Sequence, residues 1–421
     1  METTNQLRGR PPQNDRLVRG KPRLVDAPTL DAAYSHCDSR WKKGIALSQK
    51  IPFYMHDLGQ AELDSVAAVL AGPILTTGET VARFESEFAA FLGRKHALGV
   101  TSCTGALHMS LLALGIGPGD EVITTPMTFI ATATAILEAG AKPVFVDVEA
   151  DTGNIDAAKI EAAITERTRA ILPVHLYGLM CDMREIRRIA NQHGLRVIED
   201  CAHCVEGERD GVKPGELSDT ACFSFFATKN LTCGEGGAVV TDSDELMERL
   251  KLLRIHGMTK TSADRHREGY KHWDMVTLGW KYNLDNIQAA LLLPQMQRIK
   301  QKLDRRHVLA GLYATQLASI PGVRAPCSRD ATTHARHLFT VWVAADKRDQ
   351  VVESLTRNGI GAVVNYRAIH LLSYFSETLG YKPGDFPNAE QIGAQTLSLP
   401  FYPTMPEADV RSVVRVLREC I

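Results

Sequence analysis

Apolar and polar residues first follow a helical period along the chain. From Asp57 the apolar positions recur three or four residues apart, in two groups separated by the turn-rich link Gly72–Gly78. This spacing predicts two helices joined by a loop. The apolar positions are Leu63, Val66, Ala67 and Leu70 in the first helix, and Val81, Phe84, Phe88, Phe91 and Leu92 in the second.

Short apolar runs then alternate with helical stretches. Strict alternation of strand and helix predicts an α/β fold with a largely parallel sheet covered on both faces. In such sheets, ligands bind beyond the carboxyl ends of the strands. The expected strands are 97–101, 121–125, 143–148, 170–174, 196–200, 220–226 and 238–241, and the expected helices begin at Gly105, Thr128, Ile155 and Asp182.

The alternation stops after Leu284, which predicts a second, smaller α/β domain. A long helical stretch over 286–320 precedes strands near Val323 and over 337–344, a helix near 349–358 and a final helix from Glu407. Residues 1–50 are rich in Arg, Lys, Pro and Asp and have no apolar period, so we expect a disordered or loosely docked extension. The predicted organisation is an extension at 1–50, a large domain at 51–284 and a small domain at 285–421.

Composition and charge narrow the possible partners. The chain is 44% hydrophobic and 23% charged with a net charge of -1, so its charge gives no reason to expect nucleic acid or a membrane surface as a partner. No apolar run approaches the roughly 20 residues that span a bilayer, and the start METTNQLRGRPPQNDR lacks the apolar core of a signal peptide. Nine scattered cysteines fit reduced thiols, so we expect a cytoplasmic protein without a metal site.

Lys229 is the first candidate for chemistry. It follows the strand-like run Thr220–Phe226 and precedes the glycine-rich turn Gly234–Gly237. A lysine there is commonly solvated, but a partly desolvated amine can form a Schiff base with pyridoxal 5'-phosphate (PLP). Such enzymes also need an acid that keeps the pyridine nitrogen protonated, and Asp200 ends the strand 196–200. Lys229 and Asp200 are therefore candidate catalytic residues.

A phosphate site is the second candidate. Residues 101–106 (TSCTGA) end a strand and open a helix, where unpaired backbone N–H groups and hydroxyls face an anion. We expect Cys103 and Thr104 to contact a phosphate there, with Ser224 supplying another hydroxyl. Simple capping of the helix by Ser102 or Thr104 is the alternative.

Three sequence segments resemble the signature of the DegT/DnrJ/StrS aminotransferases in order and spacing. They are EDCAH at 199–203, SFFATKN at 224–230 and GEGGAVVTD at 234–242, and the similarity runs from about Ile51 to the C-terminus. The extension before Ile51 departs from the family. The resemblance implies a fold-type-I PLP-dependent transferase, aspartate aminotransferase-like, that mostly aminates keto groups of nucleotide-linked sugars. The segments are most similar to the branch that makes 4-amino-4-deoxy-arabinose on a UDP carrier.

The resemblance also implies roles for further residues. Phe129 would lie on the cofactor ring, His203 would order Asp200 or the ring oxygen, and Asn283 would reach the phosphate of a neighbouring subunit. Core packing, a structural histidine and helix capping are the respective alternatives. Family position further suggests substrate contacts by Thr76, Tyr366 and His370, although the aromatic ring could equally be packing.

The expected reaction is transamination in two half-reactions by a homodimer with shared active sites. Glutamate would give its amine to PLP and leave as 2-oxoglutarate, and a nucleotide-linked 4-ketosugar would then take the amine. A 3-ketosugar or a cyclitol ketone is the alternative within the family. A non-catalytic PLP-binding regulatory protein would be expected to lack Lys229 or Asp200. A nicotinamide oxidoreductase would need a glycine fingerprint after a strand, whereas Gly115–Gly119 follows a helix.

Overall fold

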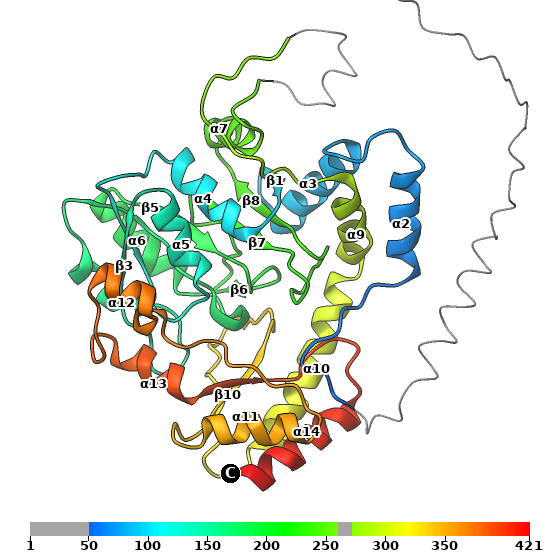
Figure 1. Cartoon of the computed structure of the whole chain (residues 1–421), viewed down its shortest axis with the longest axis vertical. Coiled ribbons are helices and arrows are strands. Elements are labelled where there is room, and N and C mark those ends of the chain that lie inside the picture. Colours follow the sequence, from blue (N-terminus) through cyan, green and yellow to red (C-terminus); the bar gives the residue numbers. More distant parts are fainter. Residues whose placement is uncertain (1–49, 260–271) are drawn as a thin grey trace, which may run out of the picture. The chain divides into compact units, whose positions relative to one another are not determined.

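The computed structural model describes residues 50–259 and 272–421 (Figure 1). The predicted extension therefore lies, apart from Lys50, outside the described residues. The described residues belong to one compact unit, and the fold below is that of this unit. Within the described ranges no helix combines the length and the apolar character needed to cross a membrane.

The largest element is a seven-stranded sheet in the order β1-β8-β7-β5-β4-β2-β3. β8 pairs antiparallel with both β1 and β7, and the other pairs are parallel, so β8 alone runs against the rest. The predicted α/β class with a mostly parallel sheet is confirmed. The strands are β1 (His96–Val100), β2 (Glu121–Thr124), β3 (Lys142–Phe145), β4 (Thr168–Ile171), β5 (Arg196–Asp200), β7 (Thr220–Ser224) and β8 (Gly237–Thr241).

Helices cover both faces of this sheet because successive strand side chains point to opposite sides. On β7, Cys222 packs with one group of helices and Phe223 with the other. Phe88 meets the ring of Phe223 edge-on at a centroid distance of 5.1 Å. The first face carries α4 (Cys103–Ala113), α5 (Ala131–Glu138) and α7 (Asp244–Arg254), and the second carries α3 (Glu79–Leu92), α6 (Met183–His193) and α9 (Asn286–Gln297).

Side-chain caps fix the starts of several helices. The side chains of Ser102, Asp182, Ser243 and Asp285 each accept a hydrogen bond from a backbone amide of the first turn of α4, α6, α7 and α9. A cap of this kind stabilises a helix by about 1 kcal/mol. Asp285 therefore caps α9, a role that the sequence had left open for Asn283.

Two helix predictions were wrong in detail. The expected helix from Ile155 is two short 3-10 turns, Ala157–Lys159 and Glu161–Ala163. Ile155 forms a β-bridge with Val148, and β4 starts soon after, which leaves no room for a longer helix. The stretch 286–320 is two helices, α9 and α10 (Ile299–Leu317), separated at Arg298.

The C-terminal residues form a second layer around a short antiparallel pair, β10 (Phe339–Trp342) and β11 (Thr396–Leu399). Tyr313 of α10 and Phe339 of β10 stack there with ring centroids 4.5 Å apart. The division into a large domain at 51–284 and a small domain at 285–421 stays a prediction. The remaining elements are α2 (Gln60–Leu70), β6 (Glu208–Arg209), β9 (Thr332–Thr333), α11 (Arg348–Arg357), α12 (Ser373–Leu379), α13 (Pro387–Gln395) and α14 (Glu407–Cys420).

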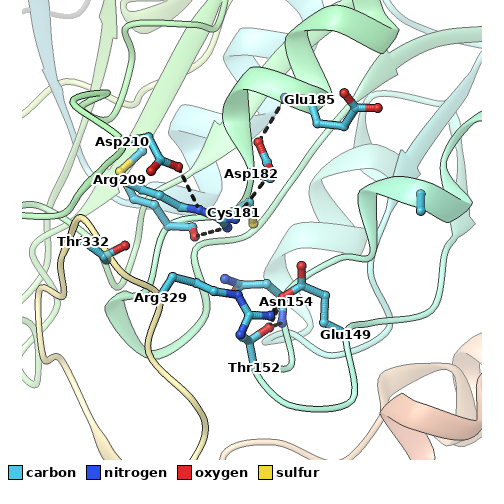
Figure 2. A network of polar contacts seen from close by, with 12 residues as sticks. Glu149, Thr152, Asn154, Cys181, Asp182, Glu185, Arg209, Asp210, Arg329 and Thr332 are labelled. Carbon is cyan, nitrogen blue, oxygen red and sulfur yellow. Dashed lines mark hydrogen bonds and ion pairs between the residues drawn. The ribbon is translucent and has the colours of Figure 1, made fainter.

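The chain between α10 and β10 returns to the large sheet before it enters β10. β9 pairs with β6, and Arg329 forms ion pairs with Asp151 at 2.7 Å and Glu149 at 2.9 Å. Figure 2 shows Arg329 reaching the turn that also contains Thr152 and Asn154. These contacts fasten the C-terminal layer to the loops beside the carboxyl ends of the strands.

Candidate active site

The carboxyl ends of β1, β5 and β7 open onto a cavity of about 530 Å³. Its volume lies within the roughly 300–1,000 Å³ typical of ligand pockets. The structure brings most of the sequence-predicted site residues together here. Those that line the cavity are Cys103, Thr104, Phe129, Asp200, His203, Ser224, Lys229 and Tyr366.

Lys229 lies in the cavity wall just beyond β7. Its backbone amide donates to the carbonyl oxygen of Phe226 at 2.9 Å, which fixes the turn that carries the side chain. Burial lowers the pKa of Lys229 to about 8, and the carboxylate of Asp200 opposes part of this fall. An amine with such a pKa is partly unprotonated at neutral pH, as a nucleophile or base requires.

Asp200 ends β5 on the face covered by α4 and α5. Its Oδ2 accepts from the hydroxyl of Thr132 at 2.8 Å, and its Oδ1 accepts from the amide of Ala202 at 3.0 Å. The Thr132 hydroxyl lies 2.8 Å from that of Thr128 one turn earlier, and both threonines are buried. Because an ionised carboxylate only accepts, the Thr132 proton goes to Asp200 and its oxygen accepts from Thr128. Sequence reasoning missed Thr132.

The start of α4 forms a cradle for an anion. Ser102 Oγ accepts the amide of Gly105 at 3.0 Å, while the first amides of a helix have no partner within it. Gly237 of β8 passes so close that a Cβ atom there would lie 2.6 Å from the nitrogen of Cys103. Ser224 Oγ accepts the amide of Phe226 at 3.3 Å, so its proton can go to a ligand.

These groups fit the parts of PLP. An amine that can react with an aldehyde, a buried carboxylate for the ring nitrogen and a helix start for the phosphate all face one cavity. Lys229, Asp200 and the 102–104 turn would hold the cofactor.

His203 and Tyr366 form a hydrogen-bonded pair in the same cavity. His203 Nδ1 accepts the amide of Tyr177 at 3.2 Å, so Nε2 carries the proton of the neutral ring and donates to the Tyr366 oxygen at 3.1 Å. Burial lowers the pKa of His203 well below its usual range, and the charge of Lys229 adds to this effect. The ring of His337, which sequence reasoning missed, lies 4.4 Å from that of His203.

Three of the expected contacts lie elsewhere. Thr76 and Asn283 line a separate open hollow of about 380 Å³, where Asn283 Nδ2 donates to Thr77 Oγ1 at 2.8 Å. His370 is fully buried, with its Nε2 3.1 Å from Glu390 Oε1 and its ring against Phe386. Its Nδ1 is buried without a hydrogen-bond partner, and His370 does not line the cavity, so its placement does not support a substrate contact.

The sheet with its one reversed strand, together with a half-buried lysine after β7 and a buried carboxylate at the end of β5, defines a PLP-dependent transferase of fold type I. The sequence model of the DegT/DnrJ/EryC1/StrS aminotransferase family matches residues 56–418. The chain belongs to this family, and it is accordingly a PLP-dependent aminotransferase.

Known proteins resemble the chain along most of their length. The spore coat polysaccharide biosynthesis protein SpsC of Bacillus subtilis (strain 168) is 42% identical over 377 residues, which cover 88% of this chain and 97% of SpsC. Spr1654 of Streptococcus pneumoniae, solved in PLP and PMP forms, is 28% identical in the PMP form with a TM-score of 0.84, covering 88% of this chain and 98% of Spr1654. PseC of Helicobacter pylori, an aminotransferase involved in the biosynthesis of pseudoaminic acid, is 29% identical with a TM-score of 0.82, covering 88% of this chain and 99% of PseC.

Proposed function

We propose that this aminotransferase transfers an amine from glutamate to a nucleotide-linked 4-ketosugar and so makes a 4-amino sugar nucleotide for polysaccharide synthesis in the cytoplasm. The observation that carries the proposal is the placement of Lys229 and Asp200 on one cavity beside the start of α4. An inert binding protein has no need of a partly unprotonated lysine facing a carboxylate.

The side chains divide the chemistry among them. Bound PLP supplies an electron sink to the reacting carbon. Lys229 Nζ would move a proton between the substrate carbon that bears the nitrogen and the cofactor, as its pKa of about 8 allows. Asp200 would accept the hydrogen bond of the pyridine N–H and stabilise the charge on that ring. Phe129, whose ring is exposed in the cavity wall, would lie against the cofactor ring.

The relatives support a sugar as the amine acceptor. SpsC is named for polysaccharide biosynthesis and PseC for the biosynthesis of pseudoaminic acid. The choice of carbon 4 rests on the resemblance of 199–203, 224–230 and 234–242 to the 4-amino-4-deoxy-arabinose branch. A 3-ketosugar or a cyclitol ketone is the competing acceptor.

Absorption spectroscopy of the purified protein with PLP tests the reaction. Glutamate should bleach the visible band, and a UDP- or dTDP-linked 4-ketosugar should restore it faster than the matching 3-ketosugar or a cyclitol ketone. Lys229→Ala should lose this cycle, whereas Lys251→Ala, at an exposed lysine paired with Glu248, should keep it. Restoration by the 3-ketosugar or cyclitol alone would move the assignment to that acceptor. A protein that never takes up PLP would contradict the whole proposal.

We also propose a homodimer in which Asn283 completes the site of the partner. Asn283 is absent from the cavity wall of its own chain, and the cavity wall includes the exposed rings of Phe129 and Phe226. Mixing Lys229→Ala with Asn283→Ala subunits tests this proposal. Each variant alone should be weak, while random mixed dimers should regain about a quarter of the wild-type sites, because half the dimers carry one intact site. No gain on mixing would show that Asn283 acts within its own chain or not at all.

A further inference from the structure

Lys229 also lies in the wall of a second, much smaller cavity. This space of about 20 Å³ is lined in addition by Asn230, Lys302, Arg306 and His337. Two cationic side chains of α10 therefore approach Lys229 from outside the cofactor cavity. Buried cations at such close quarters need compensating charge.

Glu206 supplies that charge to Arg306. The two side chains form an ion pair between Oε1 and Nη2, with only 3% and 2% of their surfaces exposed. The other carboxylate oxygen of Glu206 accepts from Asn230 Nδ2 at 2.8 Å, and the same nitrogen donates to the carbonyl oxygen of Ala335 at 2.9 Å. Glu206 thus joins α10 to the residue that follows Lys229 in the chain.

Other charged and titratable groups lie on both sides of Lys229, and the second cation, Lys302, has its own carboxylate partner. On the cofactor side the cavity that Lys229 lines also contains Asp200, Cys103, His203, Glu235 and Tyr366. On the other side Lys302 is paired with Asp57 at 3.4 Å, and Tyr54, Tyr402 and His337 complete the wall. Burial lowers the pKa of His337 well below its usual range, and the positive charges of Lys229 and Arg306 both add to that effect. The imidazole of His337 is therefore influenced by both cations. The positive charge of Arg306 is compensated by the carboxylate of Glu206.

We propose that Glu206 is a positioning residue for Lys229: it neutralises Arg306, which lines the same small cavity as the lysine, and it anchors Asn230, the following residue. The proposal rests on the proposed role of Lys229 as the reacting amine. Loss of the Glu206 charge would leave the positive charge of Arg306 unbalanced. This charge would disfavour the protonated form of the Lys229 amine.

The test measures the lysine itself, without substrate. Full-length protein freed of cofactor is treated with an acetylating reagent across pH 6–10 (about the range that brackets a shifted lysine), and acetylation of Lys229 is followed by peptide mass spectrometry. The wild-type rate should inflect near pH 8. Glu206→Gln should inflect lower by about one pH unit, Arg306→Met should inflect higher, and the double variant should return close to wild type.

A matched control separates charge from stability. Glu85→Gln breaks another ion pair with a buried arginine, Arg254, whose members line neither cavity, so it should lower the melting temperature and leave the inflection in place. Unchanged inflections in both single variants would overturn the proposal and leave Glu206 a purely structural role. A double variant displaced as far as Glu206→Gln would overturn the charge argument. If Glu206→Gln does not fold, the upward shift of Arg306→Met still decides the question. Failure of the ketosugar assay would leave these results unaffected.

Discussion

The hydrogen bond from Thr132 to Asp200 gives the sharpest prediction about the cofactor. Thr132→Val keeps the shape of the side chain but removes the hydroxyl that donates to Asp200 Oδ2 at 2.8 Å. Thr132 is fully buried and Asp200 is 5% exposed, so their hydrogen bond is shielded from bulk solvent although both residues line the cavity. Asp200 would keep the amide of Ala202 at 3.0 Å and the weaker thiol donor of Cys103, whose Sγ lies 3.9 Å from Oδ1.

The magnitude follows from the charge of the acceptor. A hydrogen bond to an ionised group contributes about 1.5–3 kcal/mol. For a large domain, each 1 kcal/mol changes the melting temperature by roughly 2–4 °C. Thr132→Val should therefore melt about 3–12 °C below wild type without cofactor. PLP should recover part of this loss, because its ring N–H gives Asp200 a new donor.

Differential scanning fluorimetry with and without PLP measures both effects. Thr134→Val is the matched control, since Thr134 lies in the same helix and its hydroxyl donates only to the carbonyl oxygen of Ala131 at 3.2 Å. The stabilisation by PLP should be larger in Thr132→Val than in wild type or the control. Equal melting temperatures for Thr132→Val and Thr134→Val would refute the free energy assigned to the hydrogen bond between Thr132 and Asp200. An unchanged effect of PLP would refute the pairing of Asp200 with the ring nitrogen.

Three further predictions concern stability. Burial lowers the pKa of Lys229 from 10.5 to about 8, so between these pH values the folded cofactor-free protein binds fewer protons than the unfolded chain. The melting temperature should therefore rise with pH in this range. Lys229→Met should remove that part of the rise. Arg329→Met should lower the free energy of unfolding by about 1 kcal/mol in chemical denaturation and leave turnover unchanged. Arg188→Met, which breaks a more exposed ion pair, should lower it by less, and equal losses would contradict this ranking. Phe84→Ala should cost about 3–5 kcal/mol because the ring is fully buried and meets Phe225 edge-on at 5.4 Å, and a cost below 1 kcal/mol would contradict this packing.

Sequence reasoning found what local pattern and backbone position determine. The strand 196–200 was predicted to the residue because its buried run ends at an acid, and β5 has the same bounds. Lys229 and Asp200 could be singled out because Asp200 ends a strand and Lys229 follows another strand by a few residues, and both line the cavity. Their shared cavity follows from the parallel order of β5 and β7, which alternation predicts.

Other features depend on contacts that no local pattern encodes. Thr132 meets Asp200 only because α5 packs on the sheet face from which Asp200 projects, and His337 meets His203 only because the chain returns from α10 to the large sheet. The Glu206–Arg306 pair joins residues one hundred positions apart. The prediction of a helix from Ile155 was wrong. The apolar spacing there is helical, but the segment starts at the β-bridge of Ile155 with Val148 and must end before β4.

The reversed strand has a consequence for synthesis of the protein on the ribosome. β1 joins the sheet through β8, and Val100 pairs with Gly237, so β1 must wait until β8 has been made. The turn at the start of α4 therefore lacks its closest neighbour through much of translation. Pairings between such distant segments form slowly and expose apolar surface meanwhile. The nascent chain should thus acquire its affinity for PLP late, and truncated chains that end before Gly237 should not retain the cofactor.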